Sequence, residues 1–328
     1  MAPERDPRAG DRLDRAILGE EPSLNALDVA AETGVTVDQA RRLWRALGFP
    51  EFVGERAFNS SDVKAVATLM TFVDAGAIDF DMAINLTRGV GQTMARLADW
   101  EVSTLVSRVE ELAAADEATG SRVSSAVRLI EEVNPPFEQL LLYAWRRHLA
   151  AAVARIEAMG ANDEDLHTID VTVGFADLVS FTALSNQLDR GDIGDLVELF
   201  ESRCHDVVAR FGGRAIKSLG DSVLFVTTDA VAAVEISEGI VNVVGRDPKM
   251  PDVRVGLASG AVVMRLGDVF GPPVNMAARL TQVARRNRII VDQRTADLLP
   301  AEEWEHRRLP ARPVRGFGLV EPLTIRRR

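Results

Sequence analysis

Residues 214–226, RAIKSLGDSVLFV, combine the pattern of a β-hairpin with opposite charges inside an otherwise apolar run. The residues on either side of Gly220 predict two short strands. Gly220 and Asp221 predict the tight turn between them, because glycine adopts positive φ at little cost. Lys217 lies four residues before Asp221, and burying either charge is costly unless it is paired. Both side chains therefore need partners from elsewhere in the sequence.

The elements around the hairpin alternate between strands and helices. Residues 169–178, IDVTVGFADL, alternate and are rich in β-branched side chains, which predicts a strand. Residues 192–213 predict an amphipathic helix that buries Cys204 and ends at two glycines. The later elements are a helix over 229–245, a strand over 252–264 that turns at Gly260, a helix that begins at Pro272–Pro273 and a short buried strand over 288–292. The order β-α-β-β-α-β, with additions, predicts a ferredoxin-like α/β sandwich.

The first 150 residues predict an all-α domain. Residues 37–47, VDQARRLWRAL, and 60–76, SSDVKAVATLMTFVDAG, carry apolar side chains at helical spacing. A long helix over 137–159 follows, and the polar residues after it suggest a domain boundary. The predicted fold class is therefore α+β, with a helical domain over 1–150, a linker over 151–168 and the α/β domain over 169–328.

The composition is that of an ordinary globular chain, with 328 residues of which 47% are hydrophobic and 27% are charged. The formal net charge of −11 argues against a protein whose whole surface binds nucleic acid. One cysteine, Cys204, excludes an intrachain disulfide and a zinc site of several thiolates. The N-terminus lacks the apolar stretch of a secretory signal, and no run reaches the roughly 18 apolar residues that span a bilayer. We therefore expect a cytoplasmic protein.

Two aspartates lie at strand ends that a ferredoxin-like sheet brings side by side. Asp177 ends the strand in FADLVSFT, and Asp221 occupies the tip of the neighbouring hairpin. Either residue alone is more simply a turn or cap residue. Together they are two carboxylates that repel each other unless they share a proton or a cation. Because Mg²⁺ takes carboxylates together with substrate phosphates, the pair indicates a metal-dependent phosphate site.

A third motif, GDVFGPPVNMAARLT at residues 267–281, opens a predicted helix with polar side chains. Asn275 and Arg279 are four residues apart and therefore share one face of this helix. An amide and a guanidinium presented together suit the oxygens of a reacting phosphate, although an isolated pair is more often a solvated face. Asp268 precedes the helix in a glycine-flanked loop, where a turn residue is the simpler interpretation.

These motifs resemble those of class III nucleotidyl cyclase catalytic domains. FADLVSFT, KSLGDSVLF and GDVFGPPVNMAARL occur in the family's order and at suitable spacing, and the resemblance covers residues 171–325. It implies a cyclase domain that uses two metal ions. One ion would activate the ribose 3′-hydroxyl of ATP for attack on the α-phosphorus, and the other would hold the triphosphate. No covalent nucleophile is needed.

The resemblance also implies roles for residues that bind metal and base. Asp177 and Asp221, with the backbone carbonyl of Leu178, would bind two Mg²⁺ or Mn²⁺ ions per site. Lys217 and Asp268 would read adenine, whose ring nitrogens accept hydrogen bonds and whose exocyclic amine donates one. Guanylyl members of the family typically carry Glu and Cys at these two places, so ATP is favoured over GTP.

Three further residues are implied to act on the sugar and the phosphates. Asn275 would orient the ribose, Arg279 would stabilise charge developing on the phosphates, and Arg315, in RPVRGFG, would contact the terminal phosphates. In the family the site forms between two catalytic domains arranged head to tail, one supplying the aspartates and the other the lysine, Asp268, the asparagine and Arg279. Because this chain contains both sets, a symmetric homodimer would hold two complete sites and a monomer would be inactive.

The N-terminal domain carries a less specific pattern. Residues 27–49 resemble a helix-turn-helix, with Arg41, Arg42 and Arg45 on its second helix. DNA binding would require these arginines to meet phosphates or bases. A helical interaction and dimerisation module suits the acidic balance of the chain better, so nucleic acid is not the expected partner.

The whole layout is similar to actinobacterial cyclases with a helical autoinhibitory N-terminal domain, some of them pH-responsive. The N-terminal domain would restrain the two catalytic domains of the dimer through the helix around residues 140–159. Of the four histidines, His148 lies in this helix, whereas His167, His205 and His306 lie outside it. Either a proton or a lipid would be the effector of the N-terminal domain, and the sequence favours neither.

Two other classes of function compete with a cyclase. A DNA-binding regulator with a nucleotide-binding C-terminal domain would use the helix-turn-helix, but the full set of catalytic residues favours an enzyme. A diguanylate cyclase shares the sheet topology, but FGGRAIKS lacks an acidic pair after Gly212–Gly213. The sequence therefore predicts an adenylate cyclase that makes 3′,5′-cyclic AMP and pyrophosphate.

Overall fold

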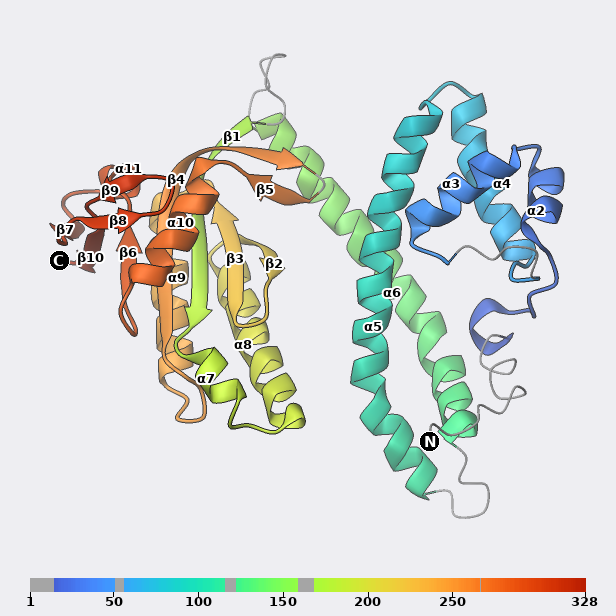
Figure 1. The fold of residues 1–328 in the computed structure, drawn as a ribbon, viewed down its shortest axis with the longest axis horizontal. Helices are drawn as coiled ribbons and strands as arrows, with labels where there is room; N and C mark the ends of the chain where they lie inside the picture. The colour runs from blue at the N-terminus through green and yellow to red at the C-terminus, as the bar shows by residue number, and fades with distance from the viewer. Residues whose placement is uncertain (1–14, 51–55, 116–121, 159–167, 266) are drawn as a thin grey trace. The chain divides into compact units, whose positions relative to one another are not determined.

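The computed structural model describes residues 15–50, 56–115, 122–158, 168–265 and 267–328, which fall into two compact units, Met1–Arg155 and Ile156–Arg328 (Figure 1). Each unit has its own hydrophobic core. The segment expected to be a linker, 151–168, is helical through Ala158, and its residues 159–167, with His167, lie outside the described residues. Within the described ranges, no helix combines the length and the apolar character needed to cross a bilayer.

The first unit is helical, as the sequence predicts. Its helices are α2 Ala26–Thr33, α3 Val37–Leu47, α4 Ser60–Asp74, α5 Phe80–Ala115 and α6 Arg122–Ala158. Capping boxes begin α2, α3 and α4. These helices and the start of α5 enclose a core in which the rings of Trp44 and Phe58 lie 4.5 Å apart between centroids. An isolated β-bridge joins Leu24 to Phe58.

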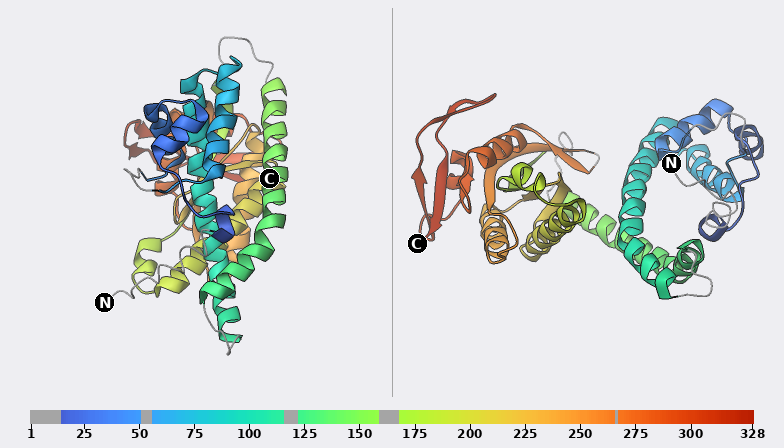
Figure 2. Two further views of the ribbon diagram at one scale, coloured as in Figure 1. Left: turned by 90° about the vertical axis from the view of Figure 1, so that its right-hand side faces the viewer. Right: turned by 60° about the horizontal axis from the view of Figure 1, so that its bottom comes forward.

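The helices α5 and α6 are long, and α6 begins earlier than the sequence predicts (Figure 2). It starts at Arg122 instead of residue 137 and passes through Pro135 and Pro136. Proline removes a helical N–H donor, but its φ suits a helix. Both prolines are exposed, and so are residues 131 and 132, whose carbonyls lose their usual partners. Water can therefore satisfy these carbonyls, which lowers the cost of continuing the helix.

The second unit is built on one mixed sheet. Its strands are β1 Thr168–Leu178, β2 Arg214–Ser218, β3 Ser222–Thr227, β4 Val253–Arg265, β5 Asp268–Phe270, β6 Ile289–Val291, β7 Trp304–Arg308 and β10 Leu323–Arg327, with a separate hairpin of β8 Arg312–Val314 and β9 Gly318–Val320. The order is β2-β3-β1-β4-β6-β10-β7, and β5 pairs with β4. The first four strands in this order form the antiparallel core of a ferredoxin-like sheet, which confirms the predicted fold class.

Helices cover both faces of this sheet. They are α7 Phe181–Ser185, α8 Arg190–Arg210, α9 Ala230–Gly245, α10 Pro272–Val283 and α11 Gln293–Asp297. The helices α8 and α9 pack on one face and α10 on the other (Figure 1). Alternation along β3 feeds both cores, since Phe225 joins the core under α8 and α9 while Leu224 joins the core under α10. Cys204 of α8 is buried, and this burial raises the pKa of its thiol.

The strand expected to turn at Gly260 does not turn there, so that prediction is wrong. β4 runs through Gly260 to Arg265 and pairs with β1 from Val253 to Val263. A Cβ at residue 260 would lie 2.9 Å from Cγ of Pro273. The glycine therefore makes room for the start of α10. A glycine that allows close packing and a glycine that forms a turn look the same in the sequence.

Candidate active site

The end of β1 and the tip of the β2–β3 hairpin bring two carboxylates together. Asp177 is paired with Ser222 in the antiparallel register, and the N–H of Leu178 donates to the carbonyl of Asp221 over 2.9 Å. The turn forms as predicted, with Gly220 at φ +67°. The convergence of Asp177 and Asp221 follows from this register. Leu178 is the last residue of β1 and its side chain is buried in the core.

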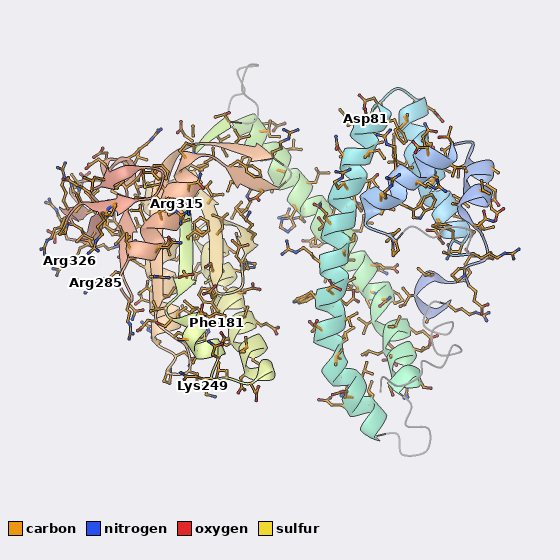
Figure 3. All side chains as sticks on the ribbon, in the orientation of Figure 1. Asp81, Phe181, Lys249, Arg285, Arg315 and Arg326 are labelled. Atoms are coloured by element: carbon orange, nitrogen blue, oxygen red, sulfur yellow. The ribbon has the colours of Figure 1, made fainter. Side chains whose placement is uncertain are left out.

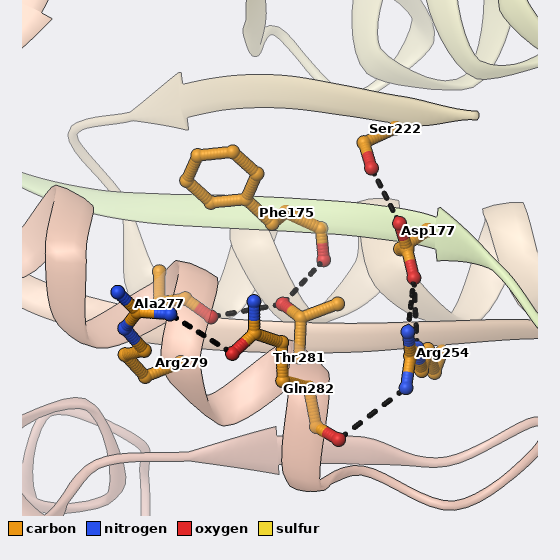
Figure 4. Close-up of polar contacts among 8 residues, drawn as sticks. All are labelled: Phe175, Asp177, Ser222, Arg254, Ala277, Arg279, Thr281 and Gln282. Carbon is orange, nitrogen blue, oxygen red and sulfur yellow. Dashed lines mark hydrogen bonds and ion pairs between the residues drawn. The ribbon is translucent and has the colours of Figure 1, made fainter. Parts of the chain in front are cut away.

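The two carboxylates affect each other electrostatically. Burial, and then the negative charge of Asp177, raise the pKa of the Asp221 carboxyl. Both oxygens of Asp177 accept hydrogen bonds, Oδ1 from the hydroxyl of Ser222 at 2.5 Å and Oδ2 from Nε of Arg254 at 2.8 Å (Figure 4). Nη2 of Arg254 lies 2.7 Å from the same Oδ2. The nearest counter-charge to Asp177 in the structure is thus a guanidinium.

Sequence reasoning missed Arg254. It lies on β4, 77 residues from Asp177, in a run that reads only as a strand. The antiparallel register of β1 with β4 sets Arg254 directly opposite Asp177. Arg254 could have been identified as a site residue from the pairing of β1 with β4, because directly opposite residues point to the same face of a sheet.

Arg254 also connects the carboxylate to α10. Its Nη1 donates to the backbone carbonyl of Gln282 over 3.3 Å, and Nη1 of Arg279 donates to the side-chain Oε1 of Gln282 over 3.1 Å (Figure 4). Two arginines are therefore held through one residue at the end of α10. One of them, Arg279, is predicted from the sequence to stabilise phosphate charge.

The helix α10 is seated tightly on the sheet. A Cβ at Gly256 of β4 would lie 2.4 Å from the backbone nitrogen of Thr281 and 2.5 Å from the carbonyl oxygen of Ala277. The hydroxyl of Thr281 donates to that carbonyl over 2.8 Å. Because the backbones are this close, the sheet determines the position of α10. Asn275, one turn before Arg279, is exposed on this helix.

Lys217 and Asp268 form an ion pair within one chain. Nζ of Lys217 lies 2.5 Å from Oδ2 of Asp268, whose Oδ1 accepts the N–H of Val269 over 2.8 Å. A register shift in β2 between Ala215 and Lys217 precedes the lysine. The sequence predicted that each residue reads a base, and the structure adds that the two side chains contact each other directly.

The lysine and the first aspartate share one face of the sheet. Lys217 lies opposite Leu224, Leu224 lies opposite Phe175, and Asp177 follows Phe175 by two residues. Because side chains alternate along a strand and paired residues point the same way, all four point to the face that α10 covers. The predicted base-reading and carboxylate groups therefore belong to one surface.

Arg315 lies in a separate hairpin from the other predicted site residues. It follows β8 in the turn before β9, where it is exposed (Figure 3). Among the described residues, no hydrogen bond or ion pair joins Arg315 to the other predicted site residues. Its role at the terminal phosphates stays a prediction.

The donor set fits a divalent cation only when other ligands complete the shell. Asp177 and Asp221 offer hard carboxylate oxygens. Oδ1 of Asp177 keeps a second lone pair beyond its hydrogen bond from Ser222, whereas two nitrogens of Arg254 contact Oδ2. Among the described residues no group of three acidic, histidine or cysteine side chains could hold a metal. A pair of carboxylates completed by phosphate oxygens and water is the arrangement that suits Mg²⁺.

In the first unit, one of the three arginines that DNA binding would require, Arg42, already has partners within the protein. Arg42 forms an ion pair of 2.7 Å with Asp81 and stacks over the ring of Phe80, with 5.0 Å from Cζ to the centroid. The neighbouring α2 and α3 form the predicted helical pair. His148 is exposed on α6.

The chain matches two family models. The adenylate and guanylate cyclase catalytic domain matches residues 165–325, and the adenylate cyclase regulatory domain matches residues 11–149. Each matched range falls within one of the two units of the structure.

Curated relatives match along nearly the whole chain. An adenylate cyclase of Streptomyces coelicolor is 38% identical, with 99% of this chain and 91% of the relative covered. An adenylate cyclase of Streptomyces griseus is 36% identical, with 100% and 91% covered. The crystal structure of the adenylyl cyclase CyaB from P. aeruginosa is 22% identical, covering 48% of this chain and 94% of that chain with a TM-score of 0.45.

Proposed function

Because this chain belongs to the adenylate cyclase family of enzymes, we propose that it converts ATP into 3′,5′-cyclic AMP and pyrophosphate, as a phosphorus–oxygen lyase. The observation that carries the proposal is that the Lys217–Asp268 ion pair lies on the same face of the sheet as Asp177. One surface of each chain therefore offers base-reading groups and a cation-binding carboxylate, which suit a nucleoside triphosphate.

The ion pair has the hydrogen-bonding character that adenine requires. The ammonium of Lys217 donates to a ring nitrogen, and the carboxylate of Asp268 accepts from the exocyclic amine. Guanine presents a carbonyl where adenine presents this amine, so the carboxylate would face an acceptor. Binding of adenine exchanges the ion pair of 2.5 Å for two hydrogen bonds to the base, and this exchange disfavours GTP.

The carboxylates of Asp177 and Asp221, with the carbonyl of Leu178, are the proposed ligands of two Mg²⁺ or Mn²⁺ ions. Such ions supply Lewis acidity toward the 3′-hydroxyl and neutralise the triphosphate. Arg254 holds Asp177 in place until the cations bind, because its guanidinium neutralises the charge that repels the Asp221 carboxyl. The guanidinium is then free to turn toward the phosphates.

The polar side chains of α10 are the proposed contacts to sugar and phosphate. Asn275 orients the ribose, and Arg279 stabilises the charge that develops on the α-phosphate as the bond to pyrophosphate breaks. Arg315 is the proposed contact to the terminal phosphates. Gln282 positions the guanidinium of Arg279 through its 3.1 Å hydrogen bond.

The site is proposed to form between two copies of the chain. One copy supplies Asp177 and Asp221, and the other supplies Lys217, Asp268, Asn275 and Arg279, so a head-to-tail homodimer holds two sites. The first unit is proposed to restrain this pair through α6, with a proton or a lipid as effector. Exposed apolar side chains on α6, among them Leu142, Tyr143 and Trp145, support a contact that such a restraint could use.

The direct test is product identification after incubation with ATP or GTP and Mg²⁺ or Mn²⁺. ATP should give cyclic AMP, and GTP should give little cyclic product. Asp177→Ala and Lys217→Glu should abolish activity, whereas Asp170→Ala, an exposed carboxylate on the same strand, should retain it. Salt-dependent and sequence-selective binding to duplex DNA without any cyclic nucleotide would favour the alternative, a DNA-binding regulator with a nucleotide-binding domain.

A further inference from the structure

A cavity of about 1000 Å³ lies in the second unit between α9, the segment that joins α10 to β6, and strands β7 and β10. Six arginines line it: Arg285, Arg288, Arg307, Arg312, Arg326 and Arg327. Of the described residues that line it, none is among the eight predicted for the active site. The cavity is therefore a feature that the cyclase reaction does not explain.

The segment that supplies most of the cavity wall is positively charged, although the chain as a whole has a negative net charge. Residues 284–328 carry eleven arginines against six acidic residues, although the whole chain has a net charge of −11. Arg327 is neutralised by Glu235, 2.7 Å away, and by Glu238, 3.5 Å away. The other five cavity arginines form no ion pair with any described residue and are exposed. Like charges that converge around one hollow repel each other, and a bound anion removes this repulsion.

The cavity wall is not only cationic. Half-buried apolar side chains from five elements or their flanks line it: Val241, Val283, Ile289, Leu309 and Ile325. Guanidinium forks recognise phosphate oxygens in pairs, and an apolar wall beside them can cover an organic group. A volume of about 1000 Å³ accommodates a ligand of nucleotide size.

We propose that this cavity binds a small oligophosphate anion bearing an organic group, at a site separate from the catalytic one. The guanidiniums come from the segment before β6 and from strands β7, β8 and β10, so they surround a compact anion. Figure 3 labels Arg285 and Arg326, which line the cavity from two of these elements. Nucleic-acid surfaces, in contrast, present their cations as a stripe along a helix or a face.

The main alternative is that the anion binds in the neighbouring hollow beside Asp177 and Asp221. Arg285 and Arg288 also line this neighbouring hollow, together with Arg254 and Val179. An anion bound there would belong to the catalytic site. Arg307 and Arg326 line the cavity proposed here and not the neighbouring hollow, so substitutions at these two residues distinguish the sites.

The experiment measures binding of inorganic tripolyphosphate to the full chain by titration calorimetry in EDTA, which removes the divalent ions that a cyclase site would use. We expect one ion per chain and weakening with added salt. Arg307→Gln with Arg326→Gln should lower the affinity at least about tenfold. The matched control is Arg308→Gln, the next residue of β7, which pairs with Glu321 over 3.4 Å and lies outside the cavity. It should change the affinity less than about twofold.

Three results would overturn the proposal. The first is no binding up to millimolar tripolyphosphate, and the second is an equal loss in the Arg308→Gln control. The third is loss of binding in Arg279→Gln with retention in the double variant, since that would assign the anion to the catalytic site. Vesicles containing phosphatidic acid form a separate arm. Cosedimentation of the chain with them, without any binding of tripolyphosphate, would assign the arginines to a lipid headgroup and reject a small soluble ligand.

Discussion

Arg254 holds the carboxylate of Asp177 with two of its nitrogens, Nε at 2.8 Å and Nη2 at 2.7 Å from Oδ2. The arginine therefore occupies the oxygen that a cation would use. Its side chain is 28% exposed and that of the aspartate 17%, so the pair is only partly screened by water.

Removal of this competing charge should tighten metal binding. Arg254→Gln should bind Mn²⁺ several-fold more tightly than the unaltered protein when no nucleotide is present, because an ion pair of about 1 kcal/mol no longer has to be broken. Cyclase activity should fall, since a guanidinium beside the phosphates is lost. Electron paramagnetic resonance of free Mn²⁺ measures the binding. Arg286→Gln, whose partner Asp252 is 3.7 Å away, is the control, and weaker Mn²⁺ binding by Arg254→Gln would contradict the idea.

Complementation tests the shared site. Asp177→Ala and Asn275→Ala should each be inactive, because each lacks one half of every site. When they are mixed in equal amounts with exchange of subunits, about a quarter of the normal activity should return, since half of the dimers then hold one intact site of two. Asp177→Ala mixed with Asp221→Ala should stay inactive. Recovery in both mixtures, or in neither, argues against a site built by two chains.

Deletion tests the restraint by the first unit. Removal of residues 1–155, which ends at the division between the two units, should raise the cyclase activity or change its dependence on pH. The physical reason is that α6, with its exposed apolar side chains, is then no longer present to hold the catalytic pair. Steady-state rates from pH 5.5 to about 8 provide the measurement, over the range where histidine titrates. Identical profiles for both proteins would speak against regulation.

The close contact between β4 and α10 makes Gly256 sensitive to substitution. Gly256→Ala puts a Cβ 2.4 Å from the backbone of Thr281, so α10 must move. The free energy of unfolding should fall by about 1–3 kcal/mol and activity should be lost, because Asn275 and Arg279 move with the helix. Gly194→Ala, in α8 with nothing within 4 Å, should instead stabilise by about 0.5–1 kcal/mol. Denaturant unfolding with an activity assay measures both, and normal activity in Gly256→Ala would refute the argument.

Asp292 gives a prediction for pH. It caps α11, and its Oδ1 accepts three hydrogen bonds, from N–H of Thr295 at 2.9 Å, from its hydroxyl at 2.5 Å and from N–H of Ser259 at 3.4 Å. Burial raises the pKa of this carboxyl in the folded state. The folded protein therefore binds the proton more tightly than the unfolded chain, and stability falls as the pH rises from about 4 through the raised value.

Asparagine can accept the same three hydrogen bonds but does not titrate. Compared with the unaltered protein, Asp292→Asn should therefore be relatively more stable at pH 7 than at pH 4. Asp292→Ala, which does not titrate either but loses the cap, should be about 1 kcal/mol less stable than Asp292→Asn at either pH. Urea unfolding at the two pH values measures the difference. A gap between Asp292→Asn and the unaltered protein that is the same at pH 4 and pH 7 would exclude the charge as the cause.

Local patterns predicted much of the fold. The hairpin at Gly220, the helix that begins at Pro272 and the apolar stripe around Cys204 all follow from neighbours in the chain, and the structure contains each of them. The sequence also identified Asp177 and Asp221 as neighbours, because the strand order of a ferredoxin-like sheet follows from the order of its elements. The predictions at Gly260 and at the start of α6 were wrong, since each depended on a contact or on solvent exposure that a local pattern does not contain.

The residue types in three short motifs were enough to indicate the kind of chemistry, because charge and hydrogen-bonding character are properties of single side chains. Which groups meet depended on pairing across long distances in the chain. Asp177 meets Arg254 across 77 residues, and Lys217 meets Asp268 across 51, because β1 and β4 share a register and β5 lies near β2. A cavity lined by arginines from three separate elements has the same origin. Strand register and close packing are set by the whole folded chain, so these contacts had to be seen in three dimensions.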